Sequence, residues 1–300
     1  MTRLIFATLS FVMFSIVLTF HAVVFAETLT LSTDSQTSYV IVLPDEATAV
    51  EQTAAKELKQ HLDVVTGADF NIVKEADVEV AKPQIVVGNS KRAKEFLPEL
   101  DVAKILYDGI VIKTVGKNLV LLGHPQRGTL YAVNTFLEDV VGVRWWTSTE
   151  TFIPKKPTLE ISEQNIEYAP KLIYREAYYR DAFDGIFATR MKCNGNMAQT
   201  TPEYGGHHRF QYFVHSFFPL IPPEKYFAEH PDWYSEINGK RRHEHAQLCL
   251  TNDAMREELT KNAINSLRRN PEAKFISISQ NDWYGYCECQ NCTAIAKEEG

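Results

Sequence analysis

The sequence lacks the features that mark several large protein classes. It contains no glycine-rich phosphate loop, no His-Glu-x-x-His and no Gly-x-Ser-x-Gly motif. It has no internal repeat and no low-complexity tract. The 31 Lys and Arg are outnumbered by 38 Asp and Glu, and the resulting net charge of -7 gives no electrostatic footprint for nucleic acid. With 45% hydrophobic and 23% charged residues, disordered, collagen-like and multi-span membrane classes are excluded.

The one long apolar run lies at the start of the chain. Residues 4–24 are almost wholly apolar after Arg3, and Val24-Phe25-Ala26 resembles a signal-peptidase site. We expect a signal peptide over residues 1–26, a secreted or periplasmic protein, and no membrane association after cleavage. Because the run is about long enough to span a bilayer, an uncleaved anchor helix is the alternative.

Residues 27–165 are predicted to form an α+β domain. Apolar residues recur at helical spacing over residues 46–66, and Gly67 is a typical C-terminal cap. A second helix is predicted over residues 127–141. Short strands are expected at residues 38–43, 70–72, 84–87 and 143–147, with a hairpin of residues 109–115 and 118–122 around Gly116-Lys117. This order indicates a sheet with two helices on one face.

Prolines 154, 157 and 170 bracket a polar stretch at residues 162–168, which marks the expected boundary with a second domain, residues 166–300. There the pattern alternates between strands at residues 172–179, 211–215, 246–250 and 274–279 and helices at residues 182–191, 223–229, 254–269 and 291–299. Four such units are half of a (β/α)8 TIM barrel, which takes about 250 residues. We therefore expect an α/β protein whose barrel is truncated; the alternative is a small open sheet complete at Gly300.

A run of amide, carboxylate and aromatic side chains follows the fourth predicted strand. Apolar and polar residues alternate over residues 275–279, and the chain continues with Gln280, Asn281, Asp282, Trp283 and Tyr284. Carboxyl ends of barrel strands line active sites, so Asp282 is the predicted catalytic acid. The two amides would bind sugar hydroxyls or an acetamido group, and the two aromatic rings would stack on a sugar. A strand-to-loop junction in which Asn and Asp only cap a turn is the alternative.

Two further substrate-binding candidates lie near strand ends. Arg175 belongs to a charge-dense predicted strand, where Arg175, Glu176, Arg180 and Asp181 either pair with one another or form the floor of a polar pocket. His215 ends the second predicted strand and would donate to a substrate hydroxyl. We expect Arg175, His215 and Asp282 to converge.

The five cysteines include a tight cluster, Cys287, Cys289 and Cys292. These three are candidate ligands of a structural zinc, with Cys193, Cys249 or a histidine as the fourth. In an exported protein a disulfide or free thiols are the favoured alternative. Apart from this possible zinc, no cofactor is expected. His243 and His245 alternate near a predicted hairpin, and without an evident third ligand we expect them to be solvated.

Two sets of motifs resemble known glycosidase families. Residues 127–139 with 142–146 resemble the end of the accessory domain that precedes the barrel in family 20 hexosaminidases and family 67 α-glucuronidases. The second domain resembles glycoside hydrolase family 163, endo-β-N-acetylglucosaminidases acting on complex N-glycans, through residues 174–176, 180–183, 213–219, 222–227, 230–234, 247–252 and 279–283.

The resemblance implies a secreted glycoside hydrolase of carbohydrate metabolism, with a glycan as its partner. Pro170 to Arg175 resembles the first-strand motif whose Arg binds sugar in family 20, whereas Asn281-Asp282 replaces that family's Asp-Glu pair. A second carboxylate is then expected beyond Gly300, unless the substrate's acetamido group is the nucleophile. Alternatives are an inactive glycan-binding protein, an α-glucuronidase-like exo-glycosidase and a metal-stabilised structural module.

Overall fold

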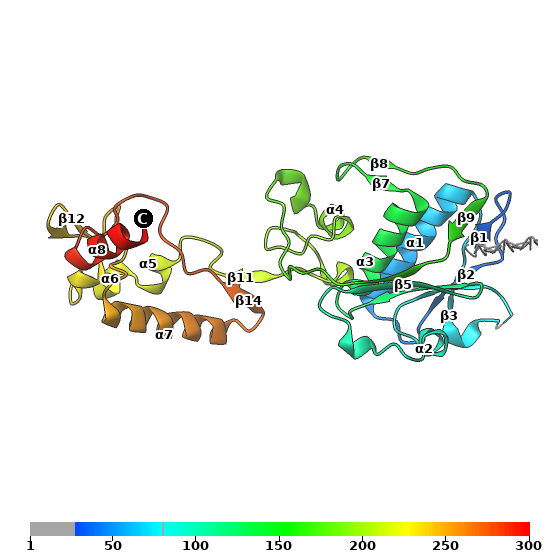
Figure 1. Ribbon diagram of the computed structural model, residues 1–300, viewed down its shortest axis with the longest axis horizontal. Helices are drawn as coiled ribbons and strands as arrows, with labels where there is room; N and C mark the ends of the chain where they lie inside the picture. The colour runs from blue at the N-terminus through cyan, green and yellow to red at the C-terminus, as the bar shows by residue number, and fades with distance from the viewer. Residues whose placement is uncertain (1–27, 80) are drawn as a thin grey trace, which may run out of the picture.

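A computed structural model describes residues 28–79 and 81–300 of the chain, so the predicted signal peptide at residues 1–26 lies outside the described residues. The molecule is elongated, with a large sheet at one end and a group of short elements at the other (Figure 1). We call residues 28–168 the first unit and residues 170–300 the second unit. No helix of the described ranges has both the length and the apolar character needed to cross a bilayer.

The first unit is built on a mixed six-stranded sheet with the order β10-β5-β6-β4-β2-β3. Its strands are β2 (Val40–Leu43), β3 (Ile72–Lys74), β4 (Gln84–Val87), β5 (Ile110–Val115), β6 (Asn118–Gly123) and β10 (Asn165–Tyr168). Strands β3, β2, β4 and β6 are parallel, whereas β5 pairs antiparallel with β6 and β10 pairs antiparallel with β5. Two small antiparallel pairs flank it: β1 (Thr28–Ser32) with β9 (Leu159–Ser162), and β7 (Arg144–Trp145) with β8 (Thr151–Phe152).

Helices cover both faces of this sheet. Helices α1 (Ala49–Thr66) and α3 (Gly128–Thr135) lie on one face, and α2 (Lys91–Phe96) lies on the other (Figure 1). A capping box starts α1: the Thr48 hydroxyl accepts a hydrogen bond from the Glu51 amide, and the Glu51 carboxylate accepts one from the Thr48 amide. Gly67 ends the helix at φ 77°, a conformation that favours glycine.

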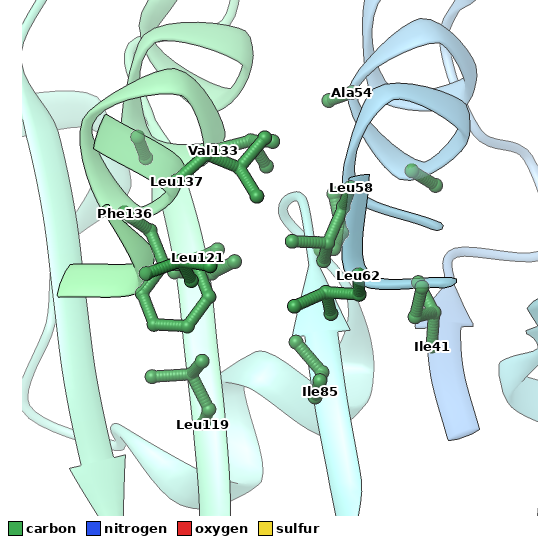
Figure 2. Packing of buried hydrophobic residues seen from close by; sticks show 14 of the residues in the cluster. Ile41, Ala54, Leu58, Leu62, Ile85, Leu119, Leu121, Val133, Phe136 and Leu137 are labelled. Carbon is green, nitrogen blue, oxygen red and sulfur yellow. The ribbon is translucent and has the colours of Figure 1, made fainter. Parts of the chain in front are cut away.

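The main hydrophobic core lies between the sheet and these two helices. Leu58 and Leu62 of α1 point toward Ile85 of β4, while Leu119 and Leu121 of β6 lie under α3 (Figure 2). All five side chains are fully buried. Full burial of one such side chain stabilises a fold by about 1.5–3 kcal/mol. Strand β4 is buried along its whole length because both faces are covered.

The structure confirms most of the expected elements of the first unit. The predicted helices are α1 and α3, the latter continued by a π-helical turn over Phe136–Val141, and the predicted hairpin is the β5–β6 pair. The polar stretch at residues 162–168 differs from the expectation, because its second half is strand β10, which pairs with β5. The mixed α/β class is therefore correct.

The second unit consists of short elements joined by long irregular segments. Its helices are α4 (Gly185–Arg190), α5 (Phe217–Leu220), α6 (Pro223–Tyr226), α7 (Asp253–Arg269) and α8 (Gln290–Glu299). Strands β11 (Arg209–Gln211) and β14 (Ala273–Ile276) form a parallel pair, and β12 (Glu236–Ile237) and β13 (Lys240–Arg241) form a hairpin. Four predicted helices correspond to α4, α6, α7 and α8.

Half of a TIM barrel is not confirmed by this arrangement. Two of the four expected strands are present, as β11 and β14, but residues 172–179 and 246–250 are irregular. Their backbone groups bond to loops instead of neighbouring strands. Asn194 exchanges hydrogen bonds with the Arg175 backbone, while Gln247 and Cys249 donate to the carbonyls of Gly285 and Trp233. Residues 246–249 are buried in a loop-built core, whereas Leu172, Ile173, Tyr178 and Tyr179 of the first segment are exposed.

Candidate functional site

The loops that follow β11 and β14 run side by side. The Ser277 amide donates to the carbonyl of Tyr212 at 3.1 Å, and the amides of Ser216 and Phe217 donate to the carbonyl of Ser279 at 3.1 Å. The Ser279 amide in turn donates to the Ser216 hydroxyl at 2.9 Å. Because parallel strands end at the same edge, these bonds hold two polar loops together there.

His215 and Asp282 meet at this edge. The His215 Nε2 atom lies 3.9 Å from the Asp282 Oδ1 atom, and the side chains are 46% and 86% exposed. The His215 Nδ1 atom lies 3.0 Å from the Gln280 carbonyl, which orients the other ring nitrogen toward the carboxylate. His215 has a φ of 55°, an uncommon conformation for a residue with a side chain. Such strain often marks functional positions.

Asn281 points inward and supports this loop. Its side chain is almost fully buried, its amide nitrogen donates to the Ala246 carbonyl at 3.1 Å, and its backbone amide donates to the Gln247 Oε1 atom at 2.8 Å. Gln247 completes the exchange by donating to the Asn281 carbonyl at 3.0 Å. Asn281 therefore positions its exposed neighbour Asp282, and its predicted contact with substrate stays a prediction.

The predicted stacking residues lie on a neighbouring surface. Trp283 is partly exposed, donates its indole N–H to the Ala246 carbonyl at 2.8 Å, and has its ring 5.9 Å from that of His245. Tyr284 is 84% exposed. With Arg242, these side chains line a cavity of about 780 Å³. Gln280 lines an adjacent cavity of about 550 Å³, together with Phe217 and Ile278.

Arg175 is engaged elsewhere. Its guanidinium donates to the Asp108 carboxylate at 2.6 Å and to the carbonyls of Leu172 and Lys192. Asp108 is fully buried and also accepts from Arg127 at 2.9 Å and Asn194 at 2.8 Å, so it connects the two units. In the described ranges no contact joins Arg175 to the His215–Asp282 pair. The predicted convergence thus holds for two of the three residues.

The other charges of this predicted strand do not pair with one another. The Glu176 carboxylate accepts from the Tyr174 hydroxyl at 2.6 Å, and Asp181 accepts from the Ser148 amide at 2.9 Å. Arg127 begins the stretch that resembles the glycosidase accessory domain, but no sequence signal indicated its partner Asp108, which lies in a short turn before β5.

Four of the five cysteines converge. The Sγ atoms of Cys249, Cys287, Cys289 and Cys292 all lie within 4.8 Å of one another, and Cys193 is outside the group. Of the candidate fourth ligands, Cys193, Cys249 or a histidine, Cys249 is therefore the one that lies beside the other three cysteines. Burial raises the pKa of Cys287 to about 12. Burial would also raise the pKa of Cys289, but hydrogen bonds from the Cys292 backbone and neighbouring thiols outweigh it and lower that pKa to about 6.

The histidine candidates do not form a comparable group. Within the part of the chain that the structure describes, the four cysteines are the one set of three or more metal-binding side chains at ligand spacing. The ring of His243 packs against Phe227 at 4.5 Å, and that of His245 faces Trp283. Burial, together with the charge of Arg127, lowers the pKa of His208.

Two family models match the chain. The model described as Domain of unknown function (DUF4838) matches residues 145–300, and the model described as Glycosyl hydrolase family 67 N-terminus matches residues 20–136. No curated protein matches. The second match supports the expected relationship of the first unit to a glycoside hydrolase family. Family 163 specifically is not supported.

Solved structures give more remote likenesses. The structure described as "A novel family GH115 4-O-Methyl-alpha-glucuronidase, BtGH115A, with specificity for decorated arabinogalactans" is 14% identical with a TM-score of 0.49 and covers 80% of this chain and 41% of its own. "Structure of CpGH84D" is 13% identical with a TM-score of 0.30, covering 46% of this chain and 21% of its own. A structure described as a "GH138 enzyme targeting pectin rhamnogalacturonan II" is 20% identical with a TM-score of 0.24, covering 34% of this chain and 13% of its own. The chain therefore spans less than half the length of each.

Proposed function

The chain belongs to the family described as Domain of unknown function (DUF4838), and we propose that its second unit carries the acid of a secreted glycoside hydrolase acting on N-acetylglucosamine-containing glycans. The observation that carries this proposal is the exposed His215–Asp282 pair at the carboxyl edge of β11 and β14. The first unit, with its match to a family 67 N-terminus, supports a glycosidase setting.

In this proposal Asp282 donates a proton to the glycosidic oxygen as the bond breaks. The hydrogen bonds of Asn281 and Gln247 fix the backbone on one side of Asp282, and Trp283 anchors the other side through Ala246. His215 faces the carboxylate at 3.9 Å, so a protonated ring would attract it electrostatically. A sugar stacked on Trp283 and Tyr284 would exclude water from Asp282, which favours the protonated acid that catalysis needs.

A substrate-assisted route needs one general acid and a group that polarises the acetamido group, rather than two carboxylates. The acetamido oxygen of the substrate would attack the anomeric carbon, and Asp282 would give its proton to the departing oxygen. Water would then open the cyclic intermediate and return a proton to Asp282. Export through the segment at residues 1–26 belongs to this proposal, since N-glycans are met outside the cytoplasm.

An α-glucuronidase-like activity is the second candidate. The match of residues 20–136 to the family 67 N-terminus favours it. Arg242, which lines the cavity beside Trp283, offers a guanidinium suited to the carboxylate of a uronic acid.

The test compares three forms of the natural full-length protein. Wild type, Asp282→Asn and the control Asp139→Asn, an exposed carboxylate of the first unit, are assayed on a complex N-glycan glycopeptide and on a 4-O-methylglucuronoxylan oligosaccharide. Loss of a general acid costs about 10²–10⁴-fold in rate. We expect such a loss in kcat for Asp282→Asn alone, with unchanged folding.

The substrates also separate the candidates. Turnover of the glycopeptide supports the first candidate, and turnover of the uronide alone supports the second. Equal turnover by wild type and Asp282→Asn would contradict the role of Asp282. Glycan binding without turnover by any form would identify a binding protein instead.

A further inference from the structure

The four converging cysteines come from two distant segments. Cys249 precedes α7, whereas Cys287, Cys289 and Cys292 lie in the loop before α8 and in its first turn. The Cys249 Sγ atom is 3.7 Å from that of Cys289 and 3.8 Å from that of Cys292. All five cysteines are free, so none of these contacts is a disulfide.

These spacings fit a tetrahedral metal site. Zinc–sulfur bonds are about 2.3 Å long, which places neighbouring sulfurs of a tetrahedron about 3.8 Å apart. A disulfide requires sulfurs about 2.05 Å apart. Four sulfur ligands suit zinc or iron and exclude magnesium or calcium, which prefer oxygen.

The surroundings suit negatively charged sulfurs. The Glu236 amide donates to the Cys287 Sγ atom at 3.3 Å, and the Arg241 guanidinium donates to the same atom at 3.6 Å. The Thr251 hydroxyl lies 3.2 Å from the Cys292 Sγ atom. Cys289 is the N-cap of α8, where the helix dipole stabilises negative charge. Such secondary contacts hold metal ligands in position.

Helix α8 has little else to hold it in place. None of its ten residues is buried. Its first turn is attached through the cysteine cluster, and the preceding loop is attached to the β12–β13 hairpin, where the Glu288 amide donates to the Glu236 carbonyl at 2.7 Å. A helix without a buried face is not stabilised by apolar packing.

We propose that Cys249, Cys287, Cys289 and Cys292 bind one zinc ion as four thiolates, in a structural site that anchors α8 and its preceding loop to the segment before α7. Zinc replaces the four thiol protons, which pass to solvent, and Arg241 offsets part of the remaining negative charge. Four protein ligands leave no open position for substrate, so the site is structural rather than catalytic. The inference does not rest on the proposed glycosidase activity, although Cys287 and Cys292 also line the cavity beside Trp283 and Tyr284.

The test begins with metal content. The full chain, purified without a polyhistidine tag and without chelator, is analysed by inductively coupled plasma mass spectrometry. We expect about one zinc per chain, retained in Cys193→Ser and lost in Cys249→Ser and Cys289→Ser. Cys193→Ser is the matched control because that cysteine lies outside the cluster. Retention of zinc in both cluster variants would overturn the proposal, as would iron in its place.

A second measurement does not depend on the folding of the variants. Thiols of the wild-type chain are counted under denaturing conditions with chelator and without reductant. The zinc site predicts five free thiols from the five cysteines, whereas two disulfides within the cluster would leave one. Growth in cobalt should give the intense visible absorption of a tetrahedral sulfur site. One free thiol, or five thiols without any bound metal, would overturn the assignment.

Discussion

The two units are stabilised by different means. The first unit packs the amphipathic helix α1 and the almost fully buried helix α3 on a six-stranded sheet around a continuous apolar cluster. The second unit has a smaller cluster, centred on Tyr234, Leu248 and Met255, and relies on loop-to-loop hydrogen bonds and the four cysteines. The regular unit carries little chemistry, whereas the irregular unit holds the exposed His–Asp pair and the thiol cluster. Binding and catalytic side chains lie disproportionately on loops that are positioned by a more regular scaffold.

The largest effect is expected where the two units join. Asp108→Asn removes the carboxylate that neutralises the buried Arg127 and pairs with Arg175. Breaking a buried pair typically costs about 3–5 kcal/mol. We expect a loss of this size in the free energy of unfolding, measured in urea by circular dichroism.

The control for this substitution is Glu167→Gln, which breaks the exposed pair with Lys113. Exposed pairs contribute about 0–1 kcal/mol. Equal effects of Asp108→Asn and Glu167→Gln would show that Asp108 does not couple the units.

A core substitution measures the apolar stabilisation of the first unit. Leu58→Ala empties part of the space between α1 and β4, and such changes cost about 2–5 kcal/mol. Val64→Ala, on the exposed side of the same helix, should stay within about 0.5 kcal/mol. Similar losses for both would contradict the packing that separates this unit from the second one.

A smaller effect should appear on acidification. Burial lowers the pKa of His61. Glu57 raises this pKa and the charge of Arg190 lowers it, and the net shift is downward. Below about pH 6.5 the unfolded chain binds a proton at His61 more readily than the folded chain does. The free energy of unfolding therefore falls as the pH drops below 6.5, and this contribution is fully present above that pH. His61→Gln should show a shallower loss between pH 7 and pH 5. A difference in slope that persists at pH 8, where the histidine is neutral, would point to another cause.

The comparison also explains what the sequence could predict. In α1, the apolar spacing and Gly67 predicted the helix without reference to the rest of the chain, although it begins at Ala49 rather than at residue 46. The pattern of residues 172–179 is typical of a strand, but no neighbouring strand pairs with them. Arg175 instead donates to Asp108, which lies 67 residues earlier in the chain. The proximity of Cys249 to Cys289, 40 residues apart, carries no spacing signal. The sequence thus predicted α1 and the meeting of His215 and Asp282 at the ends of adjacent strands, but it did not predict the network around Asp108.

Hydrogen exchange with and without chelator tests the contrast between the units most directly. Native-state exchange reports the local free energy of opening. Removing the metal should release the amides of residues 236–241, 247–252 and 287–299, while those of β2, β4 and β6 stay protected. If chelator leaves the second unit unchanged, or weakens both units equally, the two units do not differ in the way proposed here.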